Sequence, residues 1–150
     1  MKTAKVLTEE DLTPPNLKKI LEGIYIDSDL NERGHLIVYA DPTVAVLIKL
    51  DQYRKLLQFQ LAYNNVNLQL GVKNVNRMNN NHILCRFSVS EEGDILFIDF
   101  DLPYIGGVTP YQLLAVLRTL TTVAPAAIVE EASRIQQEPS TSIEPDRILN

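Results

Sequence analysis

Residues 82–102 read HILCRFSVSEEGDILFIDFDL, and this stretch decides the fold class. Apolar residues alternate with other residues on both sides of the acidic turn at 91–94, which is the period of a half-buried strand. Gly93 supplies the positive φ that a tight hairpin turn needs. The stretch therefore predicts two antiparallel strands joined by a hairpin, with Leu96, Ile98, Phe100 and Leu102 on the inward face of the second.

Upstream, the same patterns predict four more strands, at residues 25–27, 35–39, 44–50 and 57–63. The strand at 44–50 is apolar at almost every position, which is typical of a strand covered on both faces. Apolar stripes at helical spacing predict helices at 14–22, 65–79 and 110–123, and a short fourth helix at 128–135 after a break at Pro125.

The order of these segments is helix, four strands, helix, two strands, helix, helix. Tight hairpins without long crossovers predict an α+β fold, an antiparallel β-sheet with helices packed against it. We expect residues 1–137 to form a single domain, because that length can bury a core of its own. Residues 138–150 contain few large apolar side chains and are expected to form a polar, flexible tail.

The composition excludes several classes of protein. The formal net charge is -5 and the chain has no basic run, so nucleic acid is not expected as a ligand. The single cysteine, Cys85, allows no internal disulfide. The N-terminus has no signal-peptide core, and no apolar run reaches the ~20 residues that span a bilayer. We expect a cytoplasmic protein that is not bound to a membrane.

Candidate reactive groups are few. Cys85 lies in mid-strand beside Phe87 and is expected to be a buried hydrophobe, not a nucleophile. His35 and His82 are far apart in sequence and have no metal-site spacing, so neither a metal nor a cofactor is expected. Asp99 and Asp101 share one strand face and could supply an acid and a base, but alternating acids more often form a solvated face.

Two polar motifs are expected to be structural. Asn76 and Asn79 share one helix face, where their amides could pair with the backbone of a neighbouring strand. Gly106 and Gly107 precede Thr109, a pattern that fits a turn followed by a capped helix and lacks the lysine of a phosphate loop.

Residues 75–117, VNRMNNNHILCRFSVSEEGDILFIDFDLPYIGGVTPYQLLAVL, resemble the YbjN-like family of bacterial sensory-transduction regulators. The resemblance implies a fold similar to that of type III secretion chaperones and no catalytic residues. The motif residues that carry it are Asn76, Arg77, Asn79, Gly106, Gly107 and Thr109.

These observations favour a non-catalytic protein-binding adaptor, regulator or chaperone-like module that serves bacterial sensory or stress regulation. The second strand of the hairpin carries Ile95 and Phe97, then Asp99 and Asp101, on its outward face, and we expect a homodimer or a partner protein to cover them. Two alternatives remain open at this point: a small-molecule sensor, and a small enzyme that uses Asp99, Asp101 or His82.

Overall fold

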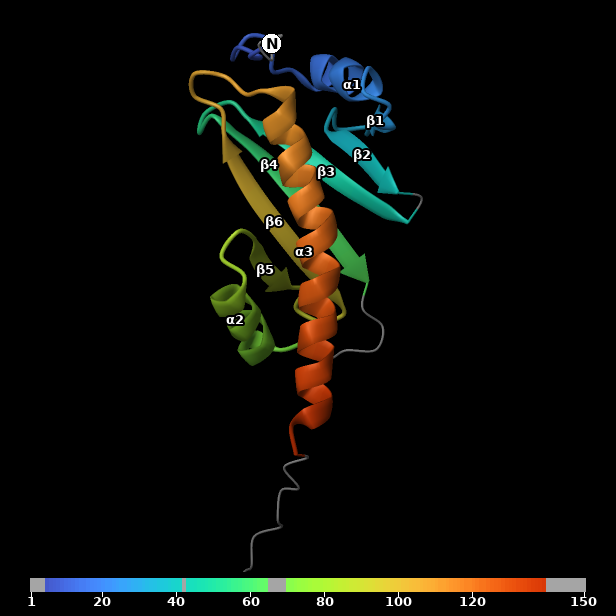
Figure 1. Ribbon diagram of the computed structural model, residues 1–150, viewed down its shortest axis with the longest axis vertical. Helices are drawn as coiled ribbons and strands as arrows, with labels where there is room; N and C mark the ends of the chain where they lie inside the picture. Colours follow the sequence, from blue (N-terminus) through green and yellow to red (C-terminus); the bar gives the residue numbers. More distant parts are fainter. Residues whose placement is uncertain (1–4, 42, 65–69, 140–150) are drawn as a thin grey trace, which may run out of the picture.

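The computed structural model describes residues 5–41, 43–64 and 70–139. Its helices are α1 (Pro14–Glu22), α2 (Val72–Asn81) and α3 (Pro110–Gln137). Its strands are β1 (Ser28–Leu30), β2 (Leu36–Asp41), β3 (Val44–Asp51), β4 (Leu56–Asn64), β5 (Arg86–Val89) and β6 (Ile95–Pro103) (Figure 1). The expected α+β class is confirmed.

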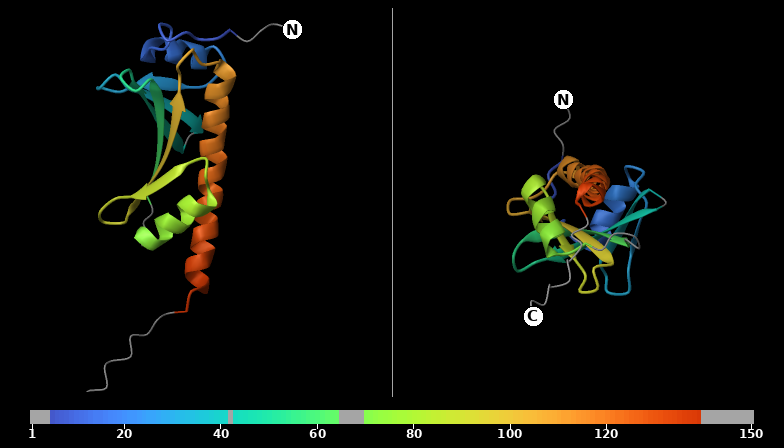
Figure 2. Two further views of the ribbon diagram at one scale, coloured as in Figure 1. Left: turned by 90° about the vertical axis from the view of Figure 1, so that its left-hand side faces the viewer. Right: turned by 90° about the horizontal axis from the view of Figure 1, so that it is seen from below.

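The six strands form one antiparallel sheet in the order β1-β2-β3-β4-β6-β5. All three helices lie on the same side of this sheet, as both views in Figure 2 show. Helix α1 contacts β1 and β2, α2 contacts β5, and α3 contacts β6. The core therefore lies between the sheet and a single layer of helices.

The register of the sheet places the expected apolar set on the helix side. Phe59 of β4 is opposite Phe100 of β6, and Leu61 is opposite Ile98. Phe59, Leu61 and Ile98 are fully buried, and Phe100 packs against the same core. The inward face proposed for residues 95–102 is thus confirmed.

Two predicted boundaries are wrong. The strand expected at 25–27 begins at Ser28, because the turn after α1 continues to Ile26, whose N–H donates to the Leu21 carbonyl at 2.9 Å. The helix expected at 65–79 begins at Val72, after Gly71, whose N–H donates to the side chain of Asn74 at 2.9 Å. Residues 65–69 of that prediction lie outside the described part of the chain.

The break expected at Pro125 is also wrong, because α3 runs through it without interruption. A proline in a helix removes one backbone hydrogen bond and costs about 3 kcal/mol. Pro125 is exposed, whereas Ala124 and Ala127 beside it are buried against the core. Packing of the buried side offsets the lost hydrogen bond, so residues 128–135 extend α3 instead of forming a fourth helix.

Strand β3 was expected to be covered on both faces, and the described chain covers only one. Val46 and Ile48 are buried on the helix side. Ala45 is exposed and Leu47 is half-buried on the other side, which faces away from all three helices (Figure 2). The apolar run at 44–50 therefore reflects one buried face and one face that remains open.

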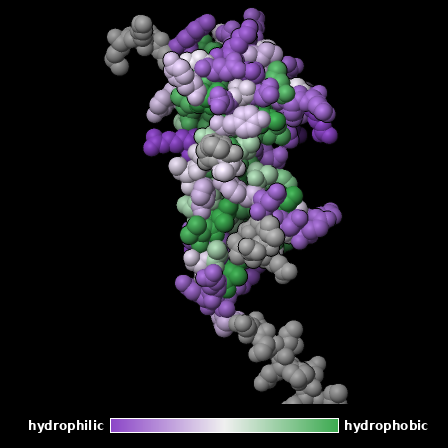
Figure 3. Space-filling model, turned by 90° about the vertical axis from the view of Figure 1, so that its right-hand side faces the viewer, coloured by the Kyte–Doolittle hydropathy of each residue, from purple (hydrophilic) through white to green (hydrophobic). Residues whose placement is uncertain are grey.

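By length and composition alone, α3 is the one helix of the described residues that could cross a membrane. Its buried side chains, among them Leu113, Leu117 and Leu120, form the core against the sheet, and core helices of soluble proteins pass the same test. Figure 3 shows apolar surface on the lower half of the molecule, where Figure 1 shows α3 running beyond the sheet.

Candidate functional site

The face of the sheet opposite the helices is the candidate functional site, and we call it the open face. The outward side chains of five strands form it, and each is half-buried or exposed. Its apolar members include Ile37, Tyr39, Ala45, Leu47, Ala62, Ile95 and Phe97, and its polar members include Lys49, Gln58, Gln60, Arg86, Ser88, Asp99 and Asp101.

The register of the sheet determines which side chains lie next to each other on the open face. Phe97 lies between Ala62 on β4 and Ser88 on β5. Both neighbours are small and exposed, and the Phe97 side chain between them is half-buried. A second aromatic side chain of the open face, Tyr39 of β2, lies opposite Ala45 and is 45% exposed.

A polar network crosses the same face beside Phe97. The side-chain amide of Gln60 donates to Asp99 Oδ1 at 2.9 Å. The guanidinium of Arg86 lies 3.9 Å from Asp99 and 3.7 Å from Asp101, and its side chain is 64% exposed. Exposed ion pairs contribute little to stability. These charges can therefore exchange partners when another charged surface approaches.

A shallow hollow of about 220 Å³ marks the edge of the open face where β5 begins. Asp99 and Asp101 line it together with Ile83 and Leu84, which are 90% and 60% exposed. Acidic and apolar groups thus share one edge of the face, a mixture common at protein interfaces.

The structure separates the three residues of the enzyme alternative. His82 lies on the helix side, where its Nε2 is 3.4 Å from Glu130 of α3 and its ring packs edge-on against Phe87. Asp99 and Asp101 lie on the opposite side of the sheet. His82 therefore cannot act together with the two aspartates on one substrate.

The other titratable candidates are also apart. Cys85 is buried as expected, although it lies just before β5 and not in mid-strand, and this burial raises the pKa of its thiol. His35 is half-buried and immediately precedes β2. Within the described ranges, no group of three or more histidine, cysteine, aspartate or glutamate side chains could hold a metal ion.

Asn79 performs the structural role expected of the asparagine pair. Its amide donates to the Phe87 carbonyl at 3.0 Å and accepts from the Phe87 N–H at 2.7 Å. It thereby pairs with β5, an edge strand, as a neighbouring strand would. Asn76 is exposed on α2, and the expectation that it also pairs with strand backbone is wrong.

The glycine–threonine motif builds the start of α3. Thr109 caps the helix, and its side chain and that of Gln112 exchange hydrogen bonds with each other's backbone N–H groups. Gly107 has a φ of 103°, and a Cβ there would lie 2.6 Å from the Leu7 carbonyl oxygen. The glycine therefore lets the N-terminal segment pair with Val108, as the Leu7–Val108 bridge shows.

A charged cluster between α2 and α3 was not anticipated. Arg77 donates to both carboxylate oxygens of Glu131, which is only 3% exposed, and to Glu138 at 2.6 Å. Asn74 also donates to Glu131 at 2.8 Å. Helical spacing continues the stripe of Ala124 and Ala127 to Glu131, so the sequence could have indicated that Glu131 is buried, but not which residue it contacts.

Burial alone would raise the pKa of the Glu131 carboxyl. Hydrogen bonds from Arg77 and Asn74 outweigh that effect and hold the pKa below its usual value. The same contact, followed by that to Glu138, raises the pKa of Arg77. The cluster is therefore charged at neutral pH and fastens α2 to the C-terminal half of α3.

Several solved structures resemble this fold, including the following two. YbjN of E. coli, described as "a putative transcription regulator", has a TM-score of 0.62 at 15% identity, over 80% of this chain and 91% of that one. The Yersinia pestis type III secretion chaperone SycH, in complex with a stable fragment of YscM2, has a TM-score of 0.54 at 18% identity, over 75% and 94%. At these identities the likeness shows the fold alone.

None of the curated protein sequences searched matches this chain. The family model of YbjN, described as "Putative bacterial sensory transduction regulator", matches residues 17–127. That range includes all six strands and α2 completely, α1 from Leu17 onward, and α3 beyond its midpoint. The chain therefore belongs to the YbjN family.

Proposed function

We propose that this protein is a non-catalytic, cytoplasmic protein-binding module, an adaptor or chaperone-like regulator in bacterial sensory or stress regulation, and that its binding surface is the open face. The observation that carries the proposal is the absence of any helix over this face among the described residues. Phe97 and its apolar neighbours lie there beside the Arg86–Asp99–Asp101 charges.

Family and fold support the same reading. The family description names regulators, and one structural neighbour is a secretion chaperone in complex with a protein fragment. The separation of His82 from Asp99 and Asp101 speaks against an enzyme that uses all three residues, whereas the two aspartates still share one shallow hollow.

A second copy of the chain is the occupant that we propose for the open face. A two-fold interface places the same surface on both sides, so it must be self-complementary. The open face carries both signs of charge, with Lys49 and Arg86 near Asp99 and Asp101, and the cations of one copy can meet the acids of the other. Phe97 can pack on its counterpart at the centre.

Sedimentation velocity at micromolar concentration tests this arrangement. We expect a dimer for the unmodified chain and a monomer for Phe97→Glu, because a carboxylate at that site would be buried without a partner. Arg118→Glu, an exposed position on α3, is the control and should remain a dimer. A monomeric unmodified chain, or a dimer unaffected by Phe97→Glu, contradicts the second copy as the occupant.

A further inference from the structure

One row of side chains across the open face carries two opposite charges that do not pair. Lys49 of β3 lies beside Gln58 of β4, and Gln58 lies beside Asp101 of β6. Neighbouring strands are about 4.8 Å apart, so Lys49 and Asp101 are separated by about 10 Å within one chain. Within the described ranges, Lys49 forms no ion pair. The row therefore consists of a cation, an amide and an acid.

Asp101 is only weakly neutralised by its own chain. Its ion-pair partner is Arg86, 3.7 Å away, whose side chain is 64% exposed and also lies 3.9 Å from Asp99. Asp99 has a further partner, because the amide of Gln60 donates to it at 2.9 Å. The side chain of Asp101 is 32% exposed and that of Asp99 is 18% exposed. Asp101 is therefore the acid of this face that a further cation can reach more easily.

A two-fold axis along β4 converts this row into two ion pairs. Such an axis exchanges the strands on either side of β4, so that β3 of one copy lies over β6 of the other. Lys49 of each copy then faces Asp101 of the other copy. The two Gln58 amides, each with a donor and an acceptor, meet at the axis. Sheets that pack face to face are about 10 Å apart, a distance that a lysine and an aspartate side chain span together.

The apolar part of the open face fits the same symmetry. Two rows further along, β3 carries Ala45 and β6 carries Phe97, on either side of Ala62 of β4. Ala45 is small and exposed, so it leaves room for the Phe97 ring of the other copy. Aligned sheets cross at about 30°, so the axis is inclined to β4 and can pass beside Phe97 while Lys49 still faces Asp101. One symmetry operation thus places a cation on an acid and a large side chain on a small one.

We propose that two reciprocal ion pairs, each between Lys49 of one copy and Asp101 of the other, fix the register of the dimer and select a second copy of this chain as the partner. This inference rests on the proposed occupation of the open face by a second copy, and it names the contacts that determine specificity. Apolar contacts around Phe97 do not by themselves fix a register. A partner surface without an acid and a cation at this spacing leaves Lys49 and Asp101 unpaired, which disfavours it.

Charge reversal in two separate chains tests these ion pairs. Lys49→Asp places an acid against Asp101 of the other copy, and Asp101→Lys places a lysine against Lys49. Sedimentation velocity should show that each variant alone self-associates about tenfold or more weakly than the unmodified chain. An equimolar mixture of the two variants should form a dimer again, because both contacts then join an acid and a lysine.

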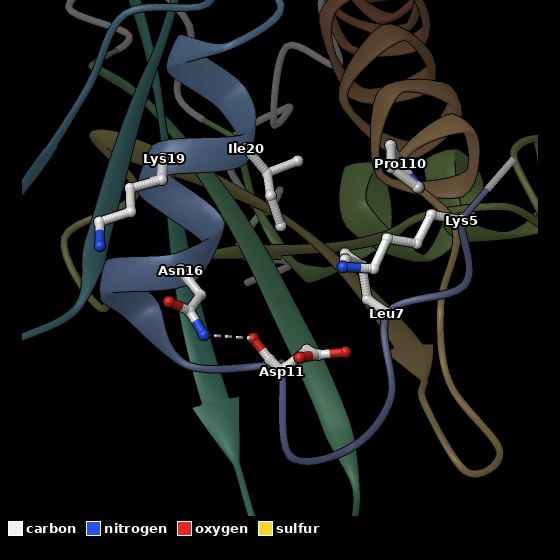
Figure 4. A pocket seen from close by; sticks show the side chains of 7 residues that line it. All are labelled: Lys5, Leu7, Asp11, Asn16, Lys19, Ile20 and Pro110. Carbon is white, nitrogen blue, oxygen red and sulfur yellow. Dashed lines mark hydrogen bonds between the residues drawn. The ribbon is translucent and has the colours of Figure 1, made fainter.

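Lys19→Asp and Glu92→Lys are the matched controls, because they make the same changes of charge away from the open face. Lys19 is exposed on α1, on the helix side of the sheet, where it borders the pocket between the N-terminal segment and α1 (Figure 4). Glu92 is exposed in the turn between β5 and β6. Both control variants should dimerise as the unmodified chain does.

The outcomes separate this inference from the proposed function. A dimeric unmodified chain overturns the ion pairs alone if the single variants dimerise as tightly as it does, or if their mixture stays monomeric. A monomeric unmodified chain overturns the second copy as the occupant, and this inference with it. A misfolded variant cannot regain binding on mixing, so a restored dimer supports the ion pairs independently of any effect on the fold.

Discussion

The side-chain amide of Asn79 hydrogen-bonds both backbone groups of Phe87, at 3.0 Å to the carbonyl and 2.7 Å from the N–H. One side chain of α2 thus occupies the place of a strand beside β5. The backbone N–H and carbonyl of an edge strand otherwise remain available to other chains. The motif residue therefore explains why α2 is attached at this edge of the sheet.

Asn79→Ala should destabilise the fold by about 1–3 kcal/mol, the cost of leaving partly buried polar groups without partners. Asn80→Ala, an exposed neighbour, should stay within about 0.5 kcal/mol. Urea unfolding of both variants measures the difference. Equal effects would mean that the Asn79–Phe87 pairing contributes nothing beyond helix propensity.

Phe100→Ala and Asp99→Ala test the sheet register. Phe100 packs against the core, so its truncation should cost about 3 kcal/mol, the lower end for a buried aromatic because part of the ring is exposed. Asp99 faces the opposite side and loses its bond from Gln60, worth about 1 kcal/mol, and an ion pair with the exposed Arg86 that contributes little. If Asp99→Ala lowered the free energy of unfolding in urea more than Phe100→Ala does, the face with Asp99 would lie in the core, which contradicts this register.

Glu131→Gln tests the cluster between α2 and α3 through pH. The pKa of Glu131 is lower in the folded chain than the ordinary value of 4.5 for a glutamate, so the ionised carboxylate stabilises the fold above that pH. The stabilisation is lost as pH falls through the lowered pKa. Thermal melts should show a clear gap between the unmodified chain and Glu131→Gln at pH 7 that closes below about pH 4.5. Glu92→Gln, in the exposed hairpin turn, should show no gap at either pH. A gap that persists in acid would contradict the charged cluster.

Deleting residues 140–150 should shift the melting temperature by no more than a few degrees, because that segment has few large apolar side chains. Deleting residues 138–150 should lower it slightly further, since Glu138 contacts Arg77 at 2.6 Å and Lys73 at 3.4 Å. Comparing the two truncations by thermal melting measures the contribution of Glu138. Loss of folding in the shorter deletion would contradict the boundary expected near residue 137.

The alternation of apolar residues with polar or small ones predicted the sheet well, because each strand buries one face only. Leu57, Phe59 and Leu61 alternate with polar or small residues, and the sequence shows which face is inward. The run at 44–50 led to the wrong prediction that both faces of β3 are covered. Its outward residues are apolar although no helix covers them, and this pattern indicates a binding surface as readily as a buried one.

The features that the sequence did not predict depend on contacts between residues far apart in the chain. Pro125 normally predicts a break, and only the packing of Ala124 and Ala127 against the core shows that the helix continues. The contact between Arg77 and Glu131 joins residues that are 54 positions apart, a distance at which no local pattern applies. The pairing of the N-terminal segment with Val108 likewise depends on the contact between Leu7 and Gly107, which lie far apart in the sequence.

The central claim, that the open face binds protein, can be tested most directly by photocrosslinking in living cells of the source organism. Ala62 on the open face and Ala115 on the outer side of α3 are both exposed, and each can be replaced with p-benzoylphenylalanine. We predict a defined crosslinked protein from position 62 and none from position 115. The crosslinked protein has twice the mass of the chain if the partner is a second copy, and another mass if the partner is a different protein. No crosslink from position 62, or the same products from both positions, would contradict it.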